Sequence, residues 1–274
     1  MEKPTFIIVS GYGWSGSSAV VDYLKEFKTV YDSQVEFRLI KDPSGIMELE
    51  SALFDNWEPI IVSNAIKKFI WFCKKCYNPN RMILSSIGLD YKNKLCKDFL
   101  KKTDVFLDSI VSYEYDMYCI YNSFLENYFE YIFQKAIRRI SKLLKGGRIE
   151  YLYKPSEYFA KISKDKFYYE VREYIDSLFA DIIEETGKTM IVLDQALSPN
   201  HSYRMKKYFN SSKMIIVDRD PRDIYVDMIY SMGLLGKDLS FTHDPKRYIM
   251  WHNSLRSTQE ELKNNDILEI NFEN

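Results

Sequence analysis

The stretch that most constrains the fold is a short apolar run followed by a glycine-rich turn and a helix pattern. Residues 5–10 (TFIIVS) are apolar enough for one buried strand, and three glycines follow within six positions. Apolar residues at helical spacing then predict a helix at 17–27. Such a turn directs backbone N–H groups and a helix N-terminus at one point, and both favour a bound anion. A strand-to-helix turn with no ligand is the alternative.

The turn has the spacing of a nucleoside triphosphate loop but lacks its lysine. Gly11 and Gly16 fit the pattern G-x-x-x-x-G-K-[ST], and Ser17 stands at the lysine position. That lysine provides the positive charge for the β- and γ-phosphates, so its absence argues against ordinary ATP or GTP hydrolysis. The hydroxyls of Ser15, Ser17 and Ser18 suit an anion that neutral donors hold.

Composition sets broad limits on the class of protein. The chain has 274 residues, 46% of them hydrophobic, which is enough for one large domain or a domain with an insertion. A net charge of −1 does not favour nucleic acid, and no apolar run is long enough to span a bilayer. The N-terminus leads into the first strand without a signal segment, and the four cysteines are unevenly spaced, so we expect a cytoplasmic protein. Cys73 and Cys76 lack a second close pair, so we expect no metal site.

Strand patterns alternate with helix patterns in the rest of the chain, except in one long middle segment. Helices are predicted at 46–54, 164–186, 221–232 and 244–263, and strands at 29–31, 189–194, 213–218 and 266–271. Residues 32–38 are predicted as a loop. The middle segment shows no strand alternation and is predicted as helices near 60–76, 90–102, 104–133 and 133–144.

This alternation predicts an α/β fold, with a P-loop-like parallel β-sheet of about four to six strands flanked by helices. Residues 1–57 and 148–274 would form the α/β core, and 58–147 a helical insertion. Ligands bind at the carboxyl ends of parallel strands. The glycine turn, Asp194 and Arg219 all follow predicted strands, which predicts one shared site.

A second motif, residues 219–224 (RDPRDI), concentrates charge directly after an apolar strand. A strand-end arginine at the start of a helix can hold a phosphate through paired N–H···O bonds. An ion-pair network that only caps the helix is the alternative.

Together the two motifs resemble those of sulfotransferases that use 3′-phosphoadenosine 5′-phosphosulfate (PAPS), and of the members that modify glycans and polysaccharides in particular. Residues 11–18 (GYGWSGSS) are similar to the family motif G-x-G-R-S-G-T-T, and 219–224 to R-D-P-R-D-v. Residues 266–274 (DILEINFEN) are similar to a late strand of the family, whereas the middle of the chain matches no family motif.

The resemblance implies transfer of a sulfuryl group from PAPS to a hydroxyl of a glycan or other small acceptor. The donor-binding residues that it implies are Gly11, Gly13, Trp14, Ser15, Gly16, Ser17, Ser18, Arg219 and Asp227. Trp14 stands where the family has a basic residue that meets the 5′-phosphosulfate, and Asp227 where it has a serine that holds the 3′-phosphate. Lys154, Arg204 and Arg222 are candidates to supply the missing positive charge.

Glu36 is the first candidate for the general base, because glycan-modifying members place a glutamate in the loop after the second strand. Arg38 is close enough in sequence to pair with Glu36 or to bind an acidic acceptor. Lys154 belongs to a segment similar to a substrate-side segment of the family, and Asp194 would either contact acceptor hydroxyls or cap a helix. The alternative bases are His243 and His252.

Two other functions stay open: a P-loop kinase or nucleotide hydrolase, and a non-catalytic sulfotransferase-like protein that binds an anion or a glycan. Residues 134–148 form a basic amphipathic helix pattern. A solvated face is the favoured interpretation of that pattern, and contact with an acidic glycan or a membrane surface is the alternative. Aromatic residues between 113 and 129 fall at helical spacing, which favours a core helix over a sugar-stacking surface.

Overall fold

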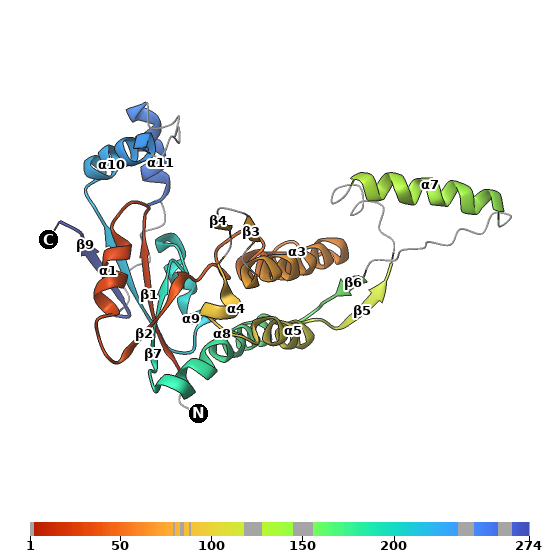
Figure 1. The fold of residues 1–274 in the computed structure, drawn as a ribbon, viewed down its shortest axis with the longest axis horizontal. Helices are drawn as coiled ribbons and strands as arrows, with labels where there is room; N and C mark the ends of the chain where they lie inside the picture. The colour runs from red at the N-terminus through yellow and green to blue at the C-terminus, as the bar shows by residue number, and fades with distance from the viewer. Residues whose placement is uncertain are drawn as a thin grey trace.

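The computed structural model describes residues 3–78, 80–82, 85–87, 89–117, 128–144, 156–234, 244–256 and 265–273. The described residues form a five-stranded parallel sheet flanked by helices (Figure 1), which confirms the predicted P-loop-like α/β fold. Across the sheet, the strands are β2 (Val30–Glu36), β7 (Met190–Asp194), β1 (Thr5–Gly11), β8 (Ser212–Asp218) and β9 (Ile267–Asn271).

Side chains of the central strand alternate between two apolar layers, as the pleat of a strand requires. Phe6 and Ile8 belong to the larger hydrophobic cluster, on the face that α8 (Lys164–Thr186) covers. Val9 belongs to a smaller cluster, together with residues of α1 (Ser17–Leu24) on the opposite face. The sheet is therefore buried on both faces, as is typical of parallel sheets.

Most of the other elements lie between β2 and β7 in the sequence. Before α8 the chain forms α2 (Ile46–Phe54), α3 (Pro59–Tyr77), β3 (Asn80–Met82), β4 (Ser85–Ile87), α4 (Tyr91–Lys94), α5 (Phe99–Ile110), β5 (Tyr113–Asp116), α7 (Tyr128–Leu144) and β6 (Ser156–Phe159). The 3₁₀ helix η1 (Pro199–Arg204) and α9 (Met205–Tyr208) follow β7, and α10 (Pro221–Leu234) and α11 (Pro245–Ser254) follow β8. No helix in the described part of the chain is long and apolar enough to cross a bilayer. The domain boundaries at 57/58 and 147/148 stay a prediction.

Helices with clear end signals agree with their predicted bounds. Both α2 and α8 span the predicted residues. The Ser163 hydroxyl accepts a hydrogen bond from the Lys166 amide at the start of α8, and Gly187 ends the helix with a φ of 67°. Polar caps and a left-handed glycine are signals that a sequence carries locally.

The prediction of a loop at residues 32–38 is wrong, because β2 continues to Glu36. This strand lies at the edge of the sheet and pairs only with β7 among the described strands. Its register shifts between Asp32 and Glu36, which interrupts the alternation of side chains. Backbone pairing therefore determines this strand, and its polar sequence does not indicate it.

The prediction of one helix over 104–133 is also wrong. The α5 helix ends at Ile110, and β5 pairs antiparallel with β6, about 40 residues later in the chain. Tyr113 lies in this two-stranded ribbon and stacks on Phe159 with ring centroids 4.9 Å apart. The tyrosine spacing that predicted a core helix therefore belongs in part to a strand, where aromatic side chains are favourable.

A buried ion pair fixes this ribbon to the body of the protein. The Glu157 side chain is 2% exposed and accepts hydrogen bonds from the Ser63 hydroxyl and the Lys67 ammonium of α3, both at 2.5 Å. The Ser63 oxygen in turn accepts from the Tyr158 amide at 3.0 Å. One carboxylate thereby joins β6 to α3.

We predict that Glu157→Ala lowers the free energy of unfolding by about 3 kcal/mol, because the variant leaves a partly buried ammonium without its partner. Urea unfolding followed by circular dichroism measures this change. Glu157→Gln is the control, since its amide oxygen still accepts from the Ser63 hydroxyl and the loss should be smaller. A loss below about 1 kcal/mol in the alanine variant would show that the pair contributes no more than an exposed one.

Candidate functional site

The carboxyl ends of β1 and β8 form the natural ligand position of this sheet. From β1 the chain leads across β7 to β2, and from β8 it leads the opposite way to β9. Connections that leave neighbouring strands in opposite directions open a crevice at their carboxyl ends, where α/β proteins bind ligands. The glycine loop, residues 11–18, follows β1, and Arg219 follows β8.

The glycine loop has a backbone that favours glycine at several positions. Gly13, Trp14 and Gly16 have φ values of 87°, 51° and 85°, in the left-handed region that favours glycine. A Cβ atom at Gly11 would overlap the Ser15 hydroxyl, and one at Gly16 would lie 2.5 Å from the ring of Phe272. Trp14 is the exception, a large side chain held in this region and 39% exposed.

The loop ends in an uncapped helix N-terminus. Gly16 is the N-cap of α1, no side chain caps the helix, and its first turn, which includes Ser17 and Ser18, contains no acidic residue. The Ser15 side chain is 1% exposed, and its hydroxyl has no hydrogen-bond partner among the described residues. Buried polar groups normally have a partner, and free helix N–H groups attract anions. Both features fit a bound phosphate or sulfate.

Arg219 lies beside the loop, and one aromatic ring connects the two motifs. Its guanidinium is 5.5 Å from the ring centroid of Phe272, the same ring that contacts Gly16. Arg219 forms an ion pair with Asp227 and a second one, at 3.5 Å, with Glu273. The glycine loop, Arg219 and Asp227, which were predicted to bind the sulfuryl donor, therefore lie close together. The Asp227 carboxylate faces Arg219 and does not point away from it.

A second group of predicted residues lies at the ends of β2 and β7. Glu36 is the register partner of Asp194, and its carboxylate lies 3.1 Å from the Arg38 guanidinium. Burial, together with the charge of Glu36, raises the pKa of Asp194 to about 6. One Asp194 oxygen is buried without a hydrogen-bond partner among the described residues. Asp194 is the register partner of Val9 on β1, so it lies one strand spacing, about 5 Å, from β1, whereas Glu36 on β2 lies two spacings, roughly 10 Å, away.

Lys41 reaches the glycine loop through one intervening side chain, although no sequence motif includes it. Its ammonium donates to the Gln195 side-chain oxygen at 3.0 Å, and the Gln195 amide nitrogen donates to the Ser17 hydroxyl at 3.0 Å. Burial lowers the pKa of Lys41. The only sequence signal for it is its position five residues after Glu36, just beyond the carboxyl end of β2.

Arg256 is a second cation that sequence patterns missed. Its guanidinium lies 4.1 Å from the ring centroid of Tyr12 in the glycine loop, and it forms an ion pair with Asp218 at the end of β8. It also donates to the backbone oxygen of His252 at 3.3 Å. Burial and the charge of Arg256 lower the pKa of His252, so this alternative base is held close to the crevice in its neutral form.

The residues predicted to replace the positive charge missing at Trp14 either lie away from the glycine loop or fall outside the described residues. Arg204 binds buried Glu50 and Tyr208. Arg222 is 88% exposed and pairs with Asp220. Lys154 and His243 lie outside the described residues. Among the described residues, Lys41 and Arg256 therefore join Arg219 as partly buried cations next to the loop.

A scan against protein-family models finds no match, and a search of curated proteins finds no similar sequence.

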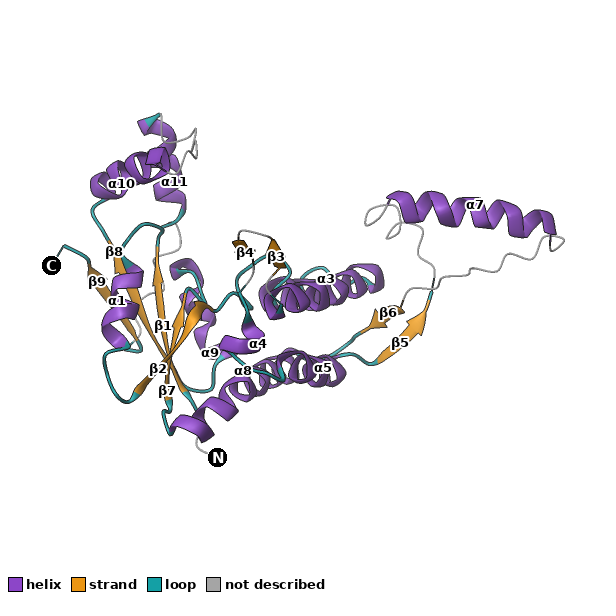
Figure 2. Cartoon of the chain, viewed as in Figure 1, coloured by secondary structure: helices purple, strands orange, loops and turns teal. Residues whose placement is uncertain are grey.

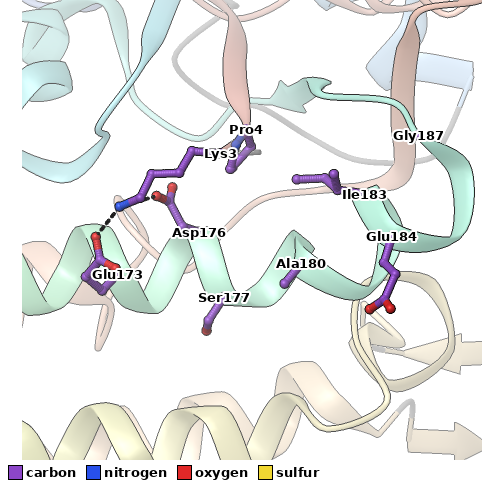
Figure 3. A pocket seen from close by; sticks show the side chains of 9 residues that line it. All are labelled: Lys3, Pro4, Glu173, Asp176, Ser177, Ala180, Ile183, Glu184 and Gly187. Carbon is purple, nitrogen blue, oxygen red and sulfur yellow. Dashed lines mark hydrogen bonds and ion pairs between the residues drawn. The ribbon is translucent and has the colours of Figure 1, made fainter. Parts of the chain in front are cut away.

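A hollow of about 590 Å³ lies at the opposite, amino-terminal edge of the sheet, between α8 and the residues that precede β1 (Figure 3). Two of its carboxylates are engaged in part: Glu173 binds Lys3 at 2.6 Å, and Asp176 accepts from Asn210 at 2.7 Å through one of its two oxygens. Its lining places three carboxylates, those of Glu173, Asp176 and Glu184, around the hollow, so it suits an anion less well than the glycine loop does. Among the described residues, no cluster of three or more His, Cys, Asp and Glu side chains is placed to hold a metal ion.

We predict that Asp194→Asn stabilises the protein at neutral pH. The folded state holds the Asp194 proton more tightly than the unfolded chain does, so wild-type stability falls as the pH rises from 3.8 to about 6. The Tm advantage of the variant should grow through this window to a few degrees and then stay constant, as thermal unfolding at several pH values would show. Glu36→Gln removes one cause of the raised pKa and should move the window to lower pH. A Tm difference independent of pH would contradict this assignment.

Proposed function

We propose that this protein is a sulfotransferase that transfers a sulfuryl group from PAPS to a hydroxyl of a glycan or another hydroxylated acceptor. The observation that carries the proposal is the shared crevice of the glycine loop and Arg219, which Phe272 joins at the carboxyl ends of β1 and β8. PAPS carries two separate anionic groups. The glycine loop and Arg219 are two separate sets of hydrogen-bond donors at the same edge of the sheet, so they fit such a molecule. This arrangement supports the proposal independently of the two sequence motifs.

The residues present fit the two ends of such a donor. The loop amides, the Ser15 hydroxyl and the N-terminus of α1 would hold the 5′-phosphosulfate. Lys41, which reaches Ser17 through Gln195, would supply the positive charge that Trp14 lacks. On the other side of the loop, Arg219 would hold the 3′-phosphate.

The chemistry requires a proton acceptor near the acceptor hydroxyl. When bound, PAPS supplies the sulfuryl group and leaves as adenosine 3′,5′-bisphosphate. Glu36 would take the proton of the acceptor hydroxyl while the hydroxyl oxygen forms its bond to sulfur and the bond from sulfur to the phosphate oxygen breaks. Donors of the loop and α1 stabilise the charge that develops on the departing phosphate. Arg38, which pairs with Glu36, would orient the base, and Asp194 would accept a hydrogen bond from the acceptor.

The ion pairs of Arg219 favour a second candidate function, namely anion or glycan binding without catalysis. Two carboxylates, Asp227 and Glu273, compensate this arginine in the structure. A phosphate has to displace at least one of them, which costs affinity for a nucleotide. Titration with nucleotides separates the two functions, and it also tests a kinase or nucleotide hydrolase.

We predict that calorimetric titration of the full chain detects binding of adenosine 3′,5′-bisphosphate and that Arg219→Ala weakens this binding roughly 30-fold or more. The cause is loss of paired, charged hydrogen bonds to a phosphate. Arg222→Ala is the matched control, since this neighbouring arginine is 88% exposed, and affinity should stay unchanged. Asp227→Ser removes a competing carboxylate and should strengthen binding.

Other outcomes of this titration point elsewhere. Binding of magnesium ATP but not of the bisphosphate would contradict the proposal in favour of a kinase or hydrolase. Binding of neither nucleotide would favour the non-catalytic function. Equal loss in Arg219→Ala and Arg222→Ala would show only a general effect of charge.

We predict that Glu36→Gln retains bisphosphate affinity and lowers sulfuryl transfer by a factor of roughly 10² to 10⁴, the usual contribution of a general base. Transfer of ³⁵S from labelled PAPS to a panel of oligosaccharides measures it. Asp194→Asn is the comparison, because its amide oxygen still accepts a hydrogen bond from the acceptor and the loss should be smaller. Full turnover in Glu36→Gln would rule out this residue as the base and direct attention to His252.

A further inference from the structure

Helix α7 stands apart from the rest of the protein. Figures 1 and 2 show it at the far end of an arm, beyond the ribbon of β5 and β6 and away from the sheet. The ribbon is fixed to α3 through Glu157, as described above. The helix therefore lies at a distance from the candidate active site.

One face of α7 is apolar and exposed. Phe129 is 82%, Phe133 65% and Leu143 85% exposed, and Ile132 and Ile140 are 45% and 56% exposed. Their spacings of three, four and seven residues place them on one side of a helix. Exposed apolar surface of this extent marks a contact with another molecule or with lipid.

Basic residues adjoin this face. Lys135, Arg139 and Lys142 are exposed and recur at spacings of four and three, which places them in one row. Arg139 follows Ile132 by seven residues, so the row borders the apolar face directly. Long basic side chains at such a border can direct their charge to lipid headgroups while their stems cover apolar surface.

We propose that α7 binds the surface of a membrane that contains anionic lipids and lies in the plane of the bilayer. Its 17 residues span about 26 Å, and its charged face prevents it from crossing the hydrocarbon core. A large apolar face beside a basic row is the pattern of helices that lie in the interface. Anionic headgroups complement the row of cations.

A second copy of the chain is the competing occupant of the apolar face. A two-helix seam uses a narrow stripe, whereas here the apolar residues cover a broad face. Pairing two copies along this face would also bring the two basic rows near each other, which like-charge repulsion opposes. The width of the apolar face and the repulsion between two basic rows therefore favour lipid over a second copy of the chain.

Flotation of the full-length protein with vesicles tests the proposal. Phosphatidylcholine vesicles that contain phosphatidylglycerol should carry the protein to the top of the gradient, and vesicles of phosphatidylcholine alone should carry much less. Neutralising the row with Lys135→Gln, Arg139→Gln and Lys142→Gln should weaken binding roughly 100-fold, at about fivefold per residue. Replacing Lys28, Lys94 and Lys97 with Gln is the matched control, since these exposed lysines lie outside the arm, and binding should be unchanged.

A second variant tests the apolar face separately. Phe133→Ser with Leu143→Ser should abolish flotation and leave the circular dichroism spectrum and Tm unchanged, because both side chains are exposed. Flotation that survives in both the neutralised and the serine variants would overturn the proposal. It would also be overturned by a dimer in analytical ultracentrifugation that the serine variant dissociates, if the wild-type protein does not bind vesicles. Bisphosphate titration is independent of α7, so failure of one proposal leaves the other standing.

Discussion

The contact between the Phe272 ring and the backbone of Gly16 holds the candidate site together. Any side chain at residue 16 would overlap the ring, and the φ of 85° independently favours glycine there. The same ring supports the Arg219 guanidinium, so one contact joins the ends of β1, β8 and β9. Because the three strands are parallel neighbours in the order β1-β8-β9, their carboxyl ends have to meet at this edge. Packing of three chain segments, and not the loop alone, therefore gives the crevice its shape.

Much of the fold could be predicted from local patterns, and the exceptions have a common cause. Buried strands such as β7 and β8 are apolar runs in the sequence. A serine cap begins α8 and a glycine ends it, so local residues indicate both ends of this helix. The edge strand β2 is polar and irregular in register, and β5 pairs with a strand about 40 residues away. In both cases pairing with a strand that is remote in sequence determines the extended backbone. The local sequence does not indicate which strand that partner is.

The candidate site divides in the same way. The glycine loop and Arg219 belong to contiguous motifs, and the parallel order of strands explains why the sequence could place them together. Lys41 and Arg256 do not belong to such motifs. Lys41 reaches the loop only through Gln195, which directly follows β7 between β2 and β1. Arg256 follows α11 and reaches the loop through the Tyr12 ring. Tertiary packing places these two cations at the site. They have no characteristic spacing from the loop in the sequence, so a motif search does not detect them.

Charge compensation at the crevice has a consequence for how an anion would enter. Arg219 is paired with Asp227 and Glu273, and Arg256 with Asp218. An incoming phosphate therefore exchanges existing ion pairs for new ones, and its net gain is smaller than at a bare arginine. Binding then depends on carboxylates that can move, and Asp227, with a side chain 44% exposed, can turn to solvent. The glycine loop differs, because Gly16 leaves the N-terminus of α1 uncapped and the Ser15 hydroxyl has no partner among the described residues. An anion would thus engage the loop first, and the exchange at Arg219 would discriminate ligands that carry a second phosphate from those that do not.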